Sequence, residues 1–251
     1  MWASVMPRVD FHQFQKENVS IILKEWGDIV RKVDPKHVII ADNIHSSVVM
    51  DCFYTRPQDD WNVSENVDRF GVSFYPKNSR TDVMKNHKRW EVFDGTGAAA
   101  KNKGFWISEM QTHNRHMFDP GAGVHPYELR MWNWEGISHG ASAIIYWMWE
   151  PFIKGVQTSA RGLVDVNGND TPRSDEAKDI GRIIAENEME FLQYKPESPN
   201  VAILYDKLSQ DFYKVYTLMY KAAVSESMYT DSIEGLYKCL WEQNIPTIRL
   251  I

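Results

Sequence analysis

Hydrophobic and polar positions along the chain alternate between a helical and an extended spacing. In residues 15–33 apolar side chains recur every three or four positions, which predicts an amphipathic helix. Asp34 followed by Pro35 ends that pattern, because a residue before proline avoids the helical region. The next apolar run predicts a buried strand that ends at Asn43.

Three more strands are predicted downstream, each separated from the next by a helical pattern. Their carboxyl ends carry polar or aromatic side chains, and alternation of strands with helices favours a parallel sheet covered by helices. The strands are expected in 69–76, 104–109 and 141–149, ending at Tyr75, at Glu109, and at Trp147 with Trp149. The helices are expected in 81–100, 126–139 and 174–191.

Glu109 is the first candidate for a catalytic residue. The apolar run 105–107 leads directly into it, and a carboxylate buried at a strand end is costly unless it is paired or used. In parallel α/β barrels the carboxyl ends of the strands carry the chemistry. The alternative is an acid solvated at a strand-to-loop junction, and position at the strand end does not decide between the two.

The pattern changes after residue 195. A strand in 199–206, a helix in 226–243 and a further strand in 244–251 form a β–α–β unit. This change predicts a domain boundary, with residues 1–195 before it and 196–251 after it.

Composition excludes several classes of protein. The formal net charge of the 251 residues is −6 and the basic residues are scattered, so nucleic-acid binding is not expected. No apolar run approaches the roughly 20 residues that span a bilayer. Cys52 and Cys239 make neither a disulfide framework nor a zinc motif. Ten tryptophans suit a cleft that stacks on sugar rings, although most are expected in the core.

Metal sites are not expected either. His113 and His116 have a spacing seen in metal sites, but no further ligand is near them in sequence. Residues 165–170 resemble the start of a calcium loop and lack its closing glutamate, so a turn explains them better. We expect no metal and no cofactor.

Five segments together carry a resemblance to a known family. They are DPKHVIIADN, GVSFYPK, GFWISEMQ, LRMWNWEGISHGASAIIYWMWE and GLVDVNGNDTPRSDEAKDIGRI. In order and spacing they resemble glycoside hydrolase family 42, the β-galactosidases of clan A, over roughly residues 8–195. The resemblance implies an α/β fold in which 1–195 are strands five to eight of a (β/α)₈ TIM barrel. Residues 196–251 are then the start of a flavodoxin-like trimerisation domain.

The resemblance also implies site residues. Glu109 matches the nucleophile of a retaining, double-displacement mechanism, and Tyr75 matches the tyrosine that hydrogen-bonds it. The remaining candidates are predicted to bind substrate: Asn43, Gln111, Trp147, Trp149 and Gln157. The family's acid/base is a glutamate preceded by asparagine on strand four. No such pair precedes the first helix here, so we expect the acid/base to lie outside this chain.

Some positions depart from the family pattern. Gln157 stands where the family has an acid that binds galactose hydroxyls, and Ala160 stands where it has histidine. Glu150 stands where the family usually has arginine. An amide lacks the charge that strengthens hydrogen bonds to hydroxyls, so the sugar specificity stays open.

Three functional hypotheses follow. The first is a retaining β-galactosidase-like hydrolase that acts on a β-galactoside or a related oligosaccharide. We expect this enzyme to be cytoplasmic and, when full length, to form a homotrimer. The second is a clan-A hydrolase of another β-glycoside. The third is a non-catalytic carbohydrate-binding or assembly module. Because one carboxyl of the catalytic pair is missing, we expect this chain alone to be inactive.

Overall fold

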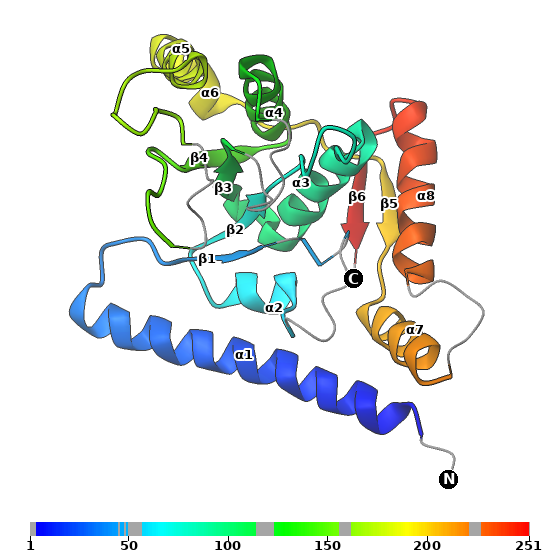
Figure 1. The fold of residues 1–251 in the computed structure, drawn as a ribbon. Helices are drawn as coiled ribbons and strands as arrows, with labels where there is room; N and C mark the ends of the chain where they lie inside the picture. Colours follow the sequence, from blue (N-terminus) through cyan, green and yellow to red (C-terminus); the bar gives the residue numbers. More distant parts are fainter. Residues whose placement is uncertain are drawn as a thin grey trace.

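Four parallel strands form the main sheet of the protein (Figure 1). The computed structural model describes residues 4–44, 46–47, 49, 57–113, 123–155, 162–220 and 227–250. The strands lie in the order β1 (Ile40–Asn43), β2 (Arg69–Phe74), β3 (Phe105–Gln111) and β4 (Ala141–Trp147), each parallel to its neighbour. The predicted α/β class with a parallel sheet is confirmed.

Helices alternate with these strands along the chain. They are α1 (Met6–Val33), α2 (Asp60–Glu65), α3 (Asn86–Ala100), α4 (Pro126–Ser138), α5 (Pro172–Glu186) and α6 (Glu188–Gln193), with a short 3₁₀ turn at Lys101–Lys103. The short helix α2 was not predicted, and α1 starts nine residues before the predicted residue 15. Asp59 caps α2 by accepting hydrogen bonds from the N–H groups of Trp61 and Asn62, at 3.0 Å each.

The hydrophobic core lies between the sheet and its covering helices. Phe70, Val72 and Phe74 alternate along β2 and all point to this face, as the two-residue period of a strand requires. The Phe74 ring lies 4.5 Å from Phe93 of α3. Gly136 lets α4 approach β3 closely, because a Cβ at this position would lie 2.4 Å from the Ile107 side chain. This tight packing holds the strands in fixed positions.

The second part of the chain is a small β–α–α–β unit. Strands β5 (Val201–Leu204) and β6 (Thr247–Leu250) are parallel, and α7 (Lys207–Tyr220) and α8 (Met228–Glu242) lie between them in sequence. The sequence predicted α8 but not α7. Ile203, Tyr205 and Ile233 belong to the same hydrophobic cluster as the main sheet. The division at 195/196 therefore stays a prediction, since both parts share one core.

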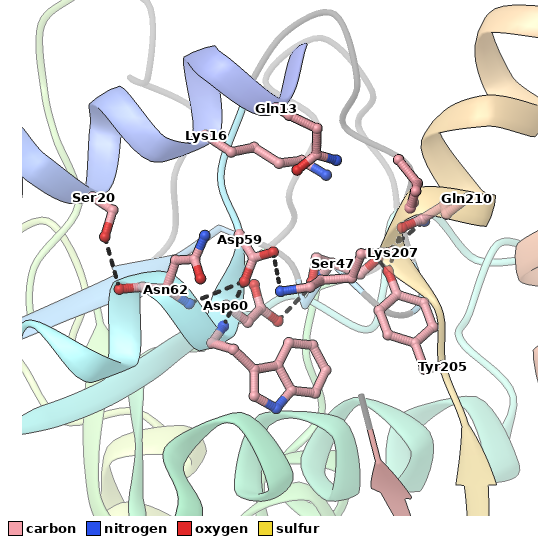
Figure 2. Close-up of polar contacts among 12 residues, drawn as sticks. Gln13, Lys16, Ser20, Ser47, Asp59, Asp60, Asn62, Tyr205, Lys207 and Gln210 are labelled. Atoms are coloured by element: carbon pink, nitrogen blue, oxygen red, sulfur yellow. Dashed lines mark hydrogen bonds and ion pairs between the residues drawn. The ribbon is translucent and has the colours of Figure 1, made fainter. Parts of the chain in front are cut away.

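Polar contacts join this unit to the amino end of α2 (Figure 2). Lys207 forms an ion pair with the buried carboxylate of Asp59, and its ammonium lies 5.5 Å from the centre of the Trp61 ring. The hydroxyl of Tyr205 lies 3.1 Å from the carbonyl oxygen of Ser47, to which it donates. These contacts tie the segment after β5 to the β1–α2 connection.

Candidate functional site

Tyr75 and Glu109 meet at the carboxyl ends of β2 and β3. The Tyr75 hydroxyl donates a hydrogen bond of 2.6 Å to Oε2 of Glu109. The register of the two strands shifts after the pair Val72–Ile107, so that Ser73 pairs with Glu109 and Ser108 is the extra residue. A bulge of this kind redirects a side chain. Glu109 is half-buried.

Gln111 ties the segments that follow these two strands. Its carboxamide oxygen accepts from the Lys77 N–H at 3.0 Å. Its nitrogen donates to the carbonyl oxygens of Lys77 and His113, at 2.7 Å each. The side chain is 0% exposed. Both amide donors are used within the protein, so its position does not support the predicted contact with substrate.

Lys77 is itself held by a buried ion pair. Its ammonium lies 2.7 and 2.8 Å from the carboxylate oxygens of Glu128 and donates to the Gly123 carbonyl at 3.1 Å. Glu128 is at the third position of α4 and also accepts from the His125 N–H at 2.8 Å, which closes the amino end of that helix. Neither Lys77 nor Glu128 was a sequence candidate.

The end of β4 is tied to the same region. The Trp147 carbonyl accepts from Nδ1–H of His113 at 3.0 Å and from the hydroxyl of Thr112 at 2.7 Å. Burial lowers the pKa of His113, so its ring is neutral at pH 7 and its proton lies on Nδ1. The same ring lies edge-on to Tyr75, with 6.3 Å between the ring centres. Trp147 is partly buried, whereas Trp149 is 59% exposed.

Asn43 ends β1 at the same edge of the sheet as Glu109, but its side chain lies on the opposite face. It pairs with Val72, whose side chain lies in the helix-covered core, and its amide donates to Asp60 of α2. Asn43 is therefore not brought together with Glu109. Its neighbour Asp42 is on the Glu109 side, where it accepts from Ser73 at 2.8 Å. The two-residue alternation of a strand is the signal that identifies Asp42, because Asp42 and the last residue of β1, Asn43, point to opposite faces.

Two further sequence candidates, Gln157 and His116, lie outside the described residues. Within the described ranges, no group of three or more His, Cys, Asp or Glu side chains is arranged to hold a metal ion. Among the helices described, none combines the length and the hydropathy needed to cross a membrane.

The arrangement suits a carboxylate that is held in one orientation for reaction. The Tyr75 phenol fixes one carboxylate oxygen of Glu109, and Trp147 at the end of β4 offers a flat apolar surface. Parallel strands deliver these groups from β2, β3 and β4 to one edge.

Comparisons with known proteins identify the fold and the family. The glycoside hydrolase family 42 model, described as β-galactosidase, matches residues 4–187. The curated β-galactosidase Bga of Halorubrum lacusprofundi is 22% identical over 174 residues, which are 63% of this chain and 23% of the relative.

Solved structures show the same similarity. The β-galactosidase of Marinomonas ef1 superimposes with a TM-score of 0.78 at 16% identity, covering all of this chain and 39% of that one. The Halorubrum lacusprofundi β-galactosidase gives 0.77 at 17%, covering all of this chain and 36% of that one. The exo-β-1,4-mannosidase Op5Man5 of an Opitutaceae bacterium gives 0.52 at 16%, over 76% of this chain and 35% of that one.

At these identities the structural matches show the fold, an α/β fold with a parallel sheet similar to that of the family 42 TIM-barrel enzymes. The chain spans less than two-fifths of the length of these relatives. The family model covers most of the chain and agrees with the sequence motifs, so the resemblance is confirmed. The chain belongs to glycoside hydrolase family 42, the β-galactosidase family.

Proposed function

We propose that this chain is the nucleophile-bearing part of a retaining β-galactosidase-like glycoside hydrolase, with Glu109 as the nucleophile. The observation that carries the proposal is the 2.6 Å hydrogen bond from Tyr75 to a half-buried carboxylate at the carboxyl edge of a parallel sheet. The hydrogen bond from Tyr75 holds that carboxylate in one orientation, as attack by a nucleophile requires.

The proposed reaction has two steps. Glu109 attacks the anomeric carbon while a second carboxyl protonates the leaving oxygen, and a covalent glycosyl-enzyme forms. Water, deprotonated by the second carboxyl, then hydrolyses this intermediate with overall retention of configuration. A retaining enzyme needs its two carboxyls about 5–5.5 Å apart. We assign the second one to residues outside this sequence.

The architecture that accompanies this role is half of a barrel. Strands β1 to β4 correspond to strands five to eight, and the β5–β6 unit begins a flavodoxin-like domain that supports a homotrimer. The proposal is supported by the strictly sequential parallel order of the four strands and by the fraction of the relatives' length that the chain covers. Trp147 and Trp149 line the sugar site in this arrangement.

A second candidate is hydrolysis of a different β-glycoside. Gln157 replaces the acid expected to bind galactose hydroxyls, and the fold also superimposes on an exo-β-1,4-mannosidase. A panel of nitrophenyl glycosides separates the two candidates. Turnover of the galactoside above the mannoside and glucoside supports the first, and the opposite order supports the second.

The role of Glu109 is tested by chemical rescue in the full-length enzyme. Glu109→Ala removes the nucleophile, so turnover of nitrophenyl β-galactoside should be lost. Azide should then restore part of the activity and yield the α-galactosyl azide, because attack occurs directly from the face that Glu109 occupied.

Two outcomes contradict the assignment. Near-normal activity of Glu109→Ala without azide removes this residue from the mechanism. A rescued product of retained configuration makes Glu109 the acid/base instead. Gln193→Ala, at an exposed position on α6, is the control and should leave turnover unchanged.

A further inference from the structure

Pro76 interrupts the pairing between β2 and β3 just beyond Tyr75. The last backbone pair is Phe74 with Met110, and proline has no N–H with which to continue the ladder. Past this point the two strands are joined by a side chain instead. Gln111 offers its amide to the Lys77 backbone and bonds both the N–H and the C=O of that residue.

This amide contact is itself anchored on both sides. On one side Gln111 also holds the His113 carbonyl, which belongs to the segment after Glu109. On the other side the Lys77 ammonium is fixed to Glu128 of α4. Gln111, Lys77 and Glu128 are 0%, 4% and 7% exposed, so water does not compete for these bonds.

The reactive pair lies within two residues of this arrangement on each strand. Tyr75 is separated from Lys77 only by Pro76. The proline ring fixes its own φ, so the backbone between Tyr75 and Lys77 has little freedom to adjust. Glu109 is separated from Gln111 only by Met110, which is fully buried. A shift of the Lys77 backbone therefore changes the distance between the Tyr75 hydroxyl and Glu109.

We propose that Gln111, together with the Lys77–Glu128 ion pair, is a positioning residue that sets the Tyr75–Glu109 hydrogen bond. The inference rests on the proposed function and replaces the predicted contact between Gln111 and substrate. Gln111 acts on the first chemical step through Tyr75, and it contributes nothing to the affinity for the sugar.

Kinetics of variants in the full-length enzyme test this proposal. Tyr75→Phe removes a hydrogen bond to a charged group and should lower kcat about 10- to 100-fold. Gln111→Met should also lower kcat, while the inhibition constant of galactose stays within about twofold of the wild-type value. The double variant should be no slower than Tyr75→Phe, because Gln111 works through the same bond.

Other roles for Gln111 give other results. A contact with substrate would raise the inhibition constant of galactose and would multiply the effect of Tyr75→Phe. A purely structural role would lower the melting temperature and leave kcat per folded molecule unchanged. Either result overturns the proposal. Gln193→Met makes the same chemical change at an exposed position and is the matched control.

A crystal structure of Gln111→Met in the 251-residue chain gives a readout without activity. The expected result is a Tyr75 hydroxyl more than about 3.5 Å from Glu109, beyond hydrogen-bond distance. An unchanged distance overturns the inference. If the full-length wild type cleaves no glycoside, the proposed function fails while this measurement still decides the positioning role. If Gln111→Met does not fold, Gln111→Glu keeps the volume but loses both donors, and the same displacement is expected.

Discussion

Asp60 is a carboxylate removed entirely from water. It accepts hydrogen bonds from the Asn43 amide, from the Ser47 N–H at 3.0 Å and from the Ser46 hydroxyl at 3.3 Å. Burial is the largest influence and raises the pKa of Asp60 to about 6, although the bond from Ser47 opposes it. The nearby charge of Asp59 also raises the pKa, and the value of about 6 includes this effect. The folded protein therefore favours protonated Asp60.

This residue should make the protein less stable as pH rises. Between the ordinary pKa of 3.8 and the folded value of about 6, the folded state binds more protons than the unfolded state, so stability falls through this range. At about 1.4 kcal/mol per pH unit the loss is about 3 kcal/mol by pH 7. Asp60→Asn lacks this loss. Its free energy of unfolding relative to wild type should therefore increase by about 2 kcal/mol between pH 4 and pH 7, measured by urea unfolding. A difference that is constant with pH would contradict this.

Periodicity predicted the main strands but misjudged which helix faces are buried. The predicted apolar stripe of α1 includes Trp26, Ile29 and Val33, which are 63%, 59% and 86% exposed. The buried residues of α1 are Val9, His12 and Lys16. Helix α7, which was not predicted, likewise buries Gln210 and Asp211 while Leu208 and Phe212 are 50% and 37% exposed. For the strands the prediction was correct, because the side chains that they bury are apolar and the alternation of apolar and polar residues identifies the buried face.

Sequence also located the Tyr75–Glu109 pair but not the residues that support it. Both lie at strand ends, which a linear pattern identifies. The bulge at Ser108, the Gln111–Lys77 contact and the Lys77–Glu128 pair join residues 34 to 51 positions apart. Such contacts depend on how strands and helices come together, and no local spacing encodes them.

The contact between α1 and α7 contains a buried ion pair. Lys16 donates to Asp211 at 2.7 and 2.9 Å, and Gln13 also donates to this carboxylate (Figure 2 shows Gln13 and Lys16 on α1). Burial raises the pKa of Asp211, but the bond from His12 and the charge of Lys16 outweigh it and hold the pKa below its ordinary value. The Asp211 carboxylate is thus ionised at neutral pH.

Breaking this pair should cost more than replacing it. Asp211→Ala leaves the Lys16 ammonium buried and should lower the free energy of unfolding by about 3–5 kcal/mol. The double variant Lys16→Met, Asp211→Leu removes both charges and should lie much closer to wild type. Urea unfolding at pH 7 measures both. The exposed pair Lys24–Asp28 on α1 is the control, since Asp28→Ala should change stability by less than about 1 kcal/mol. Equal losses in the Asp211→Ala and double variants would show that packing, not charge, joins the helices.

At the scale of the whole molecule the main sheet is open at both sides. β1 and β4 each pair with one neighbouring strand among the described residues, and Ile145 of β4 is 48% exposed on the Glu109 side of the sheet. An open edge with apolar side chains is unusual for a protein that functions alone. Completion of the sheet by further strands, as the half-barrel proposal requires, would cover these residues and bring a second carboxyl toward Glu109.

The 251-residue chain by itself should therefore hydrolyse no β-galactoside at a useful rate. If the second carboxyl lies outside these residues, as we propose, the leaving group is not protonated, a loss on the order of 10²–10⁴-fold, and the sugar meets only part of its site. Steady-state assays should compare lactose with dinitrophenyl β-galactoside, whose leaving group needs no protonation. We expect any residual activity of the chain to appear only with the activated substrate and to disappear in Glu109→Ala. Turnover of lactose on the order of 10 per second, typical of ordinary enzymes, would show that an acid within this chain, such as Glu150, protonates the leaving group.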